Sequence, residues 1–162
     1  METPPPSPVV VAIALGSNLG DRAAYLHAGL AGLRGLPHTV LDAASQLIET
    51  APVGGVDQGP YLNAAALLRT SLPPRELLEA LHAIERAHGR DRSREQRWGP
   101  RTLDLDLLTY GDVIIDEPGL TIPHPRLHER EFVLEPLAAI APALEVPGRG
   151  TVAQLLATLR GA

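Results

Sequence analysis

Apolar and polar positions along this 162-residue chain follow two periods, one typical of strands and one of helices. A continuous run rich in β-branched residues predicts a buried strand at 9–15. Glycine and asparagine in the next segment favour a turn, and Asp21 is placed to cap a helix at 22–34. Strand-like stretches within 38–50 follow, and we expect another strand at 61–71.

The second half of the chain contains a longer helix and an alternating strand. A leucine stripe led by Ser71, with two prolines in the first turn, predicts a capped helix that ends at Gly89. Strict alternation predicts a strand at 102–110. A Gly-Asp turn then leads from this strand into a further one at 113–116. The remaining predicted segments are loops at 51–60 and 120–127 and short helices near 131–140 and 152–159.

The order strand, helix, strand, strand, helix, strand defines the predicted fold class. It is the α+β, ferredoxin-like βαββαβ arrangement, an antiparallel sheet with helices packed on one face, here with extra C-terminal helices. The length suits one domain with a substantial core. We therefore expect a single domain at 9–162 after a flexible, Pro-rich tail at 1–8.

Composition excludes several classes of protein. The absence of cysteine rules out a disulfide framework and thiolate zinc sites. A net charge of −5 argues against a general nucleic-acid binder. The first apolar run is too short and too closely bounded by prolines to span a bilayer. We therefore expect a cytoplasmic protein with neither a nucleic-acid nor a membrane partner.

The candidate chemistry starts with two carboxylates in the strand at 102–110. Asp104 and Asp106 alternate with leucines, so both acids share one face of the strand. The strand rise sets them roughly 6 to 7 Å apart, a span that two bridging cations could fill. The spacing therefore favours a site for metal-bound polyphosphate, although a solvated amphipathic strand gives the same pattern.

Arginines gather directly before this strand, six of them within the sixteen-residue window 86–101. Guanidinium groups form paired hydrogen bonds to phosphate oxygens, which suits a polyphosphate ligand. Glycines and a proline in the window indicate an irregular loop that could close over a nucleotide. A solvated charged loop is the alternative.

One acid and a few aromatic residues also stand out. Glu85 falls inside the apolar stripe of its helix, where a carboxylate needs a partner unless it bends out to water. Tyr61, Trp98 and Phe132 lie near the candidate site in sequence, and flat heterocycles bind between such rings. Core filling is the alternative for each ring. The chain is too poor in aromatics for a single-stranded nucleic-acid platform.

Four segments, in order along nearly the whole predicted domain, carry a resemblance to a known family. They are IALGSNLGDR at 13–22, ETAPVGGVDQGPYLNAA at 49–65, IERAHGRDRSREQRWGPRTLDLDLL at 84–108 and IPHPRLHEREFVLEPL at 122–137. The chain resembles the 6-hydroxymethyl-7,8-dihydropterin pyrophosphokinases of folate biosynthesis. The resemblance implies a monomeric, ferredoxin-like enzyme with two Mg²⁺ ions. It would transfer the terminal diphosphate of ATP to the hydroxymethyl oxygen of the pterin and release AMP.

The resemblance also implies roles for individual residues. The catalytic set would be Arg90, Arg92, Arg101, Asp104 and Asp106, the two aspartates being the metal ligands. The ATP-binding set would be Glu85, Arg90, Arg92, Trp98, Arg101, Leu107, Thr121, His124 and Arg130. The pterin-binding set would be Thr50, Ala51, Val53, Tyr61, Asn63, Trp98 and Phe132. Ala51 and Pro125 depart from the pattern, standing where some members have proline and tyrosine.

Two other classes stay open on the residues alone. A different magnesium-dependent phosphoryl or nucleotidyl transferase would keep the acids and the arginines but cleave ATP elsewhere or ignore pterin. A noncatalytic ferredoxin-like binding module would explain the fold and leave the pairing of acids with arginines without a role.

Overall fold

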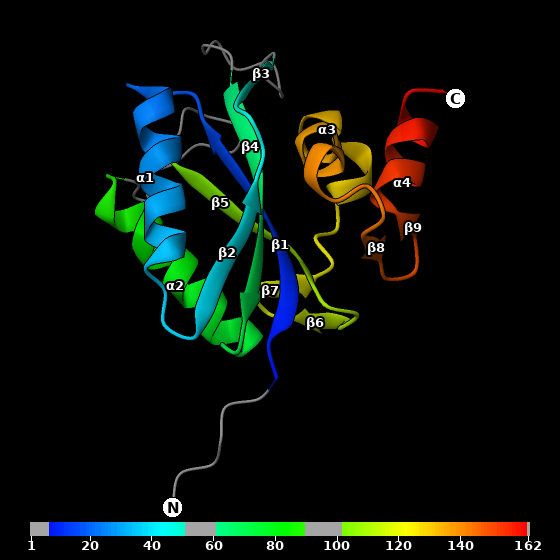
Figure 1. Ribbon diagram of the computed structural model, residues 1–162, viewed down its shortest axis with the longest axis horizontal. Coiled ribbons are helices and arrows are strands. Elements are labelled where there is room, and N and C mark those ends of the chain that lie inside the picture. The colour runs from blue at the N-terminus through cyan, green and yellow to red at the C-terminus, as the bar shows by residue number, and fades with distance from the viewer. Residues whose placement is uncertain (1–6, 51–60, 90–101, 162) are drawn as a thin grey trace, which may run out of the picture.

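A five-stranded antiparallel sheet lies at the centre of the protein (Figure 1). The computed structural model describes residues 7–50, 61–89 and 102–161. The strand order is β2-β4-β1-β5, and β3 also pairs with β4. This is the ferredoxin-like order, as the sequence predicts. The strands are β1 (Val9–Ser17), β2 (Thr39–Ala44), β3 (Ile48–Thr50), β4 (Tyr61–Thr70) and β5 (Asp104–Tyr110).

Helices cover both faces of this sheet. Helices α1 (Arg22–Arg34) and α2 (Pro74–Ala87) lie on one face, and α3 (Glu131–Ile140) and α4 (Val152–Leu159) lie on the other (Figure 1). The ferredoxin-like helices therefore share a face as predicted, while the C-terminal pair covers the opposite face. Each face has its own hydrophobic core.

Strand β1 contributes large side chains to one core and small side chains to the other. Its larger residues Val11, Ile13 and Leu15 enter the core beneath α1 and α2. Its smaller residues Ala12 and Ala14 belong to the core beneath α3 and α4. Both sets are buried because alternate side chains point to opposite faces and both faces are covered. The continuous apolar run of the sequence thus reflects a central strand.

The predicted helix ends are largely confirmed. Asp21 caps α1, because its Oδ1 accepts a hydrogen bond of 3.1 Å from the N–H of Ala24. Gly89 follows α2 with a φ of 86°, a conformation that glycine adopts without strain. The predicted capping role of Ser71 is wrong. Helix α2 begins at Pro74, and the residue at its N-cap position is a proline without a capping side chain.

The segment after β5 differs from the prediction. Strands β6 (Ile115–Glu117) and β7 (Leu120–Ile122) pair with each other in a separate hairpin, so the predicted strand at 113–116 begins and ends later. The predicted loop at 120–127 contains β7, because Leu120 and Ile122 are buried in the core beneath α1 and α2. A single 3-10 turn, η2 (Leu127–Glu129), follows.

The C-terminal elements agree with the predicted helices at 131–140 and 152–159. A second hairpin, β8 (Glu145–Val146) with β9 (Gly150–Thr151), connects α3 to α4. The predicted loop at 51–60 and most of the predicted tail at 1–8 lie outside the described residues. No helix in the described part of the chain is long and apolar enough to cross a membrane.

Candidate active site

Asp104 and Asp106 form the centre of the candidate site. Both side chains are half-buried, whereas Leu105 between them is buried in the core on the opposite face, as the alternation predicts. The strand register places Asp104 beside Gly16 and Asp106 beside Ala14. The two acids therefore border a part of the sheet with almost no side-chain bulk.

Asn63 and Tyr61 reach this same part of the sheet from β4. Gly16 of β1 pairs with Asn63 of β4 on one side and with Asp104 of β5 on the other. Asn63, Gly16 and Asp104 therefore form one row on one face of the sheet. A Cβ atom added at Gly16 would lie 3.2 Å from Asn63 Oδ1 and 3.5 Å from Tyr61 Cδ1. The missing side chain thus lets the amide and the ring approach the strand closely. The sequence reasoning missed Gly16, although its place at the end of a buried strand was a signal.

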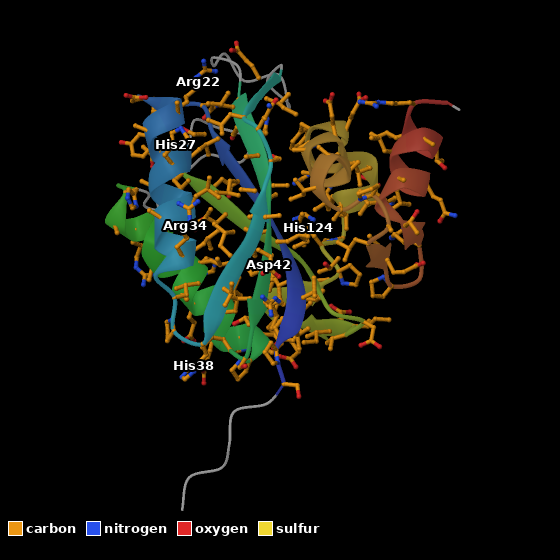
Figure 2. All side chains as sticks on the ribbon, in the orientation of Figure 1. Arg22, His27, Arg34, His38, Asp42 and His124 are labelled. Carbon is orange, nitrogen blue, oxygen red and sulfur yellow. The ribbon has the colours of Figure 1, made fainter. Side chains whose placement is uncertain are left out.

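His124 is held against the outer edge of β5. Its backbone N–H donates to the carbonyl of Leu108 at 2.8 Å, and its Nδ1 accepts from the N–H of Arg126 at 3.1 Å. An accepting Nδ1 places the proton of the neutral ring on Nε2. The ring lies on the side of the sheet where α3 packs (Figure 2).

The surroundings of His124 favour its neutral form. The pKa of His124 is lowered to about 4, chiefly by burial and next by the positive charge of Arg130. The carboxylate of Asp104 acts in the opposite direction, and Arg126 adds a smaller lowering. The influence of Asp104 and Arg130 on one imidazole shows that Asp104, His124 and Arg130 interact electrostatically.

Arg130 and Phe132 stand at the start of α3. The Cζ atom of Arg130 lies 5.7 Å from the centroid of the Phe132 ring, within the range of a cation–π contact. Phe132 is half-buried and packs against the core beneath α3 and α4. The guanidinium of Arg130 and the ring of Phe132 therefore lie together on the side of the sheet that carries the acids.

Glu85 approaches β5 from the other side. Its side chain is only 1% exposed, and its Oε2 accepts a hydrogen bond of 2.7 Å from the N–H of Leu105. The predicted position of Glu85 inside the apolar stripe, with a partner, is confirmed. The alternative in which it bends out to water is wrong.

The other predicted site residues are placed only in part. Leu107 is buried in the core beneath α1 and α2, so its side chain faces away from the acids. Thr121 is exposed on β7. The predicted residues Ala51, Val53, Arg90, Arg92, Trp98 and Arg101 and the side chain of Thr50 lie outside the described part of the structure.

The donor set fits magnesium better than most other metals. Among the residues that the structure describes, no group of three or more His, Cys, Asp or Glu side chains gathers to bind a metal. Mg²⁺ is commonly held by one or two carboxylates, with water and substrate phosphates completing its octahedron. A pair of half-buried aspartates matches that requirement and does not match a structural zinc or calcium site.

The fold and the site together fit a metal-dependent transferase that handles phosphates. The sequence profile of the 7,8-dihydro-6-hydroxymethylpterin-pyrophosphokinase (HPPK) family matches residues 12–142, and the chain belongs to this family.

Named relatives agree with the family. The chain is 46% identical over 147 residues to the 2-amino-4-hydroxy-6-hydroxymethyldihydropteridine pyrophosphokinase of Pseudomonas aeruginosa, over 91% of this chain and 90% of that protein. It is 48% identical over 133 residues to the Bacillus subtilis protein of the same name, over 82% of this chain and 78% of that protein.

Solved structures show the same fold. A crystal structure of a Plasmodium falciparum HPPK-DHPS triple mutant matches with a TM-score of 0.73 at 15% identity. The match covers 93% of this chain and 44% of that longer chain. The α+β, ferredoxin-like prediction is confirmed.

Proposed function

We propose that this pyrophosphokinase of folate biosynthesis transfers the terminal diphosphate of ATP to the hydroxymethyl oxygen of 6-hydroxymethyl-7,8-dihydropterin and releases AMP. Membership of the family supports the reaction class and the two substrates. The row Asn63–Gly16–Asp104 supports the location, because it places the Asn63 amide, a candidate pterin contact, beside the Asp104 carboxylate, a candidate metal ligand. We further propose that the enzyme works as a cytoplasmic monomer.

Asp104 and Asp106 would hold two Mg²⁺ ions against the phosphates of ATP. Bound there, the metal supplies charge screening and lowers the pKa of the attacking hydroxyl. The half-buried position of both carboxylates supports this role, since it limits competition from bulk water. Their neighbours on β1, Ala14 and Gly16, are small, so no bulky β1 side chain lies beside the carboxylates.

His124 and Arg130 would bind the phosphate chain. His124 offers Nε2–H as a donor while its ring is neutral, so this contact does not require a protonated imidazole. Arg130 supplies a permanent positive charge. The positive charges of Arg90, Arg92 and Arg101 would stabilise the negative charge of the transition state. Glu85, Trp98, Leu107 and Thr121 complete the proposed nucleotide contacts, with Leu107 contributing its backbone.

The pterin would lie between the rings of Tyr61 and Phe132, above Gly16. The Asn63 amide can donate and accept at once, which matches the alternating donors and acceptors along the edge of a pterin. The close approach of Asn63 and Tyr61 to Gly16 supports this placement. Thr50, Ala51, Val53 and Trp98 would complete the pterin contacts, largely through the backbone.

One incubation tests the reaction. The protein is mixed with ATP, MgCl₂ and 6-hydroxymethyl-7,8-dihydropterin, and both products are identified by chromatography and mass spectrometry. AMP and the pterin diphosphate are expected. ADP or free diphosphate would indicate a different transferase, and failure to bind ATP with magnesium would indicate a binding module. Asp104→Asn serves as the inactive control.

A further inference from the structure

Among the strands that the structure describes, β5 lies at an edge of the sheet, so half of its peptide groups face away from its one neighbour, β1. It lies at the end of the order β2-β4-β1-β5. Alternate residues of an antiparallel strand direct their N–H and C=O groups to opposite sides. Since the N–H of Leu105 donates to Glu85, the backbone groups of Leu105 point to the outer edge of the sheet. Asp104 and Asp106 on either side of it then direct their backbone groups toward β1.

The outer edge at Leu105 is therefore bonded by a side chain of α2. The 2.7 Å contact from the Leu105 N–H to Glu85 Oε2 is at the short end of the range for N–H···O hydrogen bonds. It is shielded from water, because Glu85 is 1% exposed. A buried N–H that lost this acceptor would be left unsatisfied. The bond therefore resists local twisting or slipping of the strand.

This contact acts directly on the geometry of the acids. Leu105 is the single residue between Asp104 and Asp106, and the rotation of its flanking peptides sets how the two carboxylates are spaced and aimed. Glu85 itself belongs to the face of the sheet opposite the acids, where Leu105 is buried in the core. Glu85 can thus influence both metal ligands through the backbone.

We propose that Glu85 is a positioning residue, whose hydrogen bond to the Leu105 N–H holds Asp104 and Asp106 in the arrangement that binds metal. The inference rests on the proposed function only in taking the two aspartates as metal ligands. It assigns to the Glu85 carboxylate a role that is separate from any contact with nucleotide. What matters is the position of the accepting oxygen, and the negative charge is secondary.

Three substitutions separate position from charge. Glu85→Gln keeps an acceptor oxygen at the same reach and removes the charge. Glu85→Asp keeps the charge and withdraws the carboxylate by one methylene. Glu85→Ala removes both. Leu81→Ala, a buried position on the same helix, is the control for lost stability, and Glu79→Ala, exposed on that helix, is the control for a lost acid.

Metal binding is measured with Mn²⁺ as the probe, by electron paramagnetic resonance, in the absence of nucleotide, so that a contact between Glu85 and nucleotide does not enter the measurement. Glu85→Asp and Glu85→Ala should each weaken Mn²⁺ affinity about tenfold or more, the usual effect of losing a group that orients metal ligands. Glu85→Gln should stay within about threefold of the parent, and both controls should match it.

The amide proton of Leu105 gives a second readout that does not depend on metal. In the metal-free protein its NMR resonance should lie downfield in the parent and move upfield in Glu85→Asp. Should Glu85→Ala fail to fold, the Asp and Gln variants carry the test. Unchanged Mn²⁺ affinity in Glu85→Asp, or an equal loss in Leu81→Ala, would overturn the proposal. Parent-like Mn²⁺ binding in Asp104→Asn and Asp106→Asn would instead contradict the metal site itself.

Discussion

His124 should stay neutral well below the pH at which histidines ordinarily gain a proton. Its pKa is lowered from 6.5 to about 4, with burial as the largest cause. Arg130 and Arg126 also lower the pKa, and Asp104 raises it. The hydrogen bond from the Arg126 N–H to Nδ1 also requires that nitrogen to be unprotonated. Protonation of the ring would break this bond and place a cation among arginines.

The consequence for stability follows from linkage. Between pH 6.5 and about pH 4 the unfolded chain binds a proton at this histidine and the folded chain does not. The free energy of unfolding therefore falls as the pH falls through this window. Above pH 6.5 the contribution is fully present. The whole depression corresponds to about 3 kcal/mol, of which about 2 kcal/mol should be lost between pH 7 and pH 5.

Two measurements on the metal-free protein check this prediction. Imidazole signals followed by NMR from about pH 8 to pH 4 should show His124 with a protonated Nε2 and little change until the acid end. Urea unfolding at about pH 7 and pH 5 should show a smaller loss of stability in His124→Gln than in the parent, by about 2 kcal/mol. Ordinary titration of His124 near 6.5, or equal losses in both proteins, would refute the reasoning.

Other substitutions test the remaining assignments. Asp104→Asn and Asp106→Asn should each abolish magnesium-dependent turnover with an unchanged circular dichroism spectrum, and normal rates in either would reject that ligand. Tyr61→Ala should weaken pterin binding in calorimetry while ATP binding hardly changes; equal losses would argue against a stacking role. Tyr110→Phe removes a buried 2.6 Å hydrogen bond to the carbonyl of Leu72 and should cost about 1 to 3 kcal/mol in urea unfolding, so parent-like stability would contradict it.

Features with a local cause could be predicted from the sequence. The start of α1 depends on one side chain and an N–H three residues away, so Asp21 is sufficient to locate it. The placement of Asp104 and Asp106 on one face follows from the strand period alone. The sequence also predicts α3 and α4, whose buried residues recur at helical spacing, Val133, Leu134 and Leu137 in α3 and Val152 and Leu156 in α4.

Features that depend on contacts between different segments could not be predicted from the sequence. Strand β7 has only three residues, too few to show a period, and two of them, Leu120 and Ile122, are buried against the core beneath α1 and α2, which is built from other segments. The role of Gly16 depends on its register with Asn63 and Asp104, which no single segment reveals. The partner of Glu85 is likewise 20 residues away in sequence.

The position of the acids along β5 explains how one strand serves both a core and a site. The register of β5 against β1 shifts between Ala12 and Ile13, so Leu108 becomes the extra residue and enters the core beneath α3 and α4. Before the shift, the same face carries Asp106 and Asp104. The apolar core thus ends at Leu108, two residues from Asp106. Packing at Leu108 and the Glu85 bond at Leu105 hold the two sides of Asp106, and this places the proposed metal ligands on a rigid segment of the sheet.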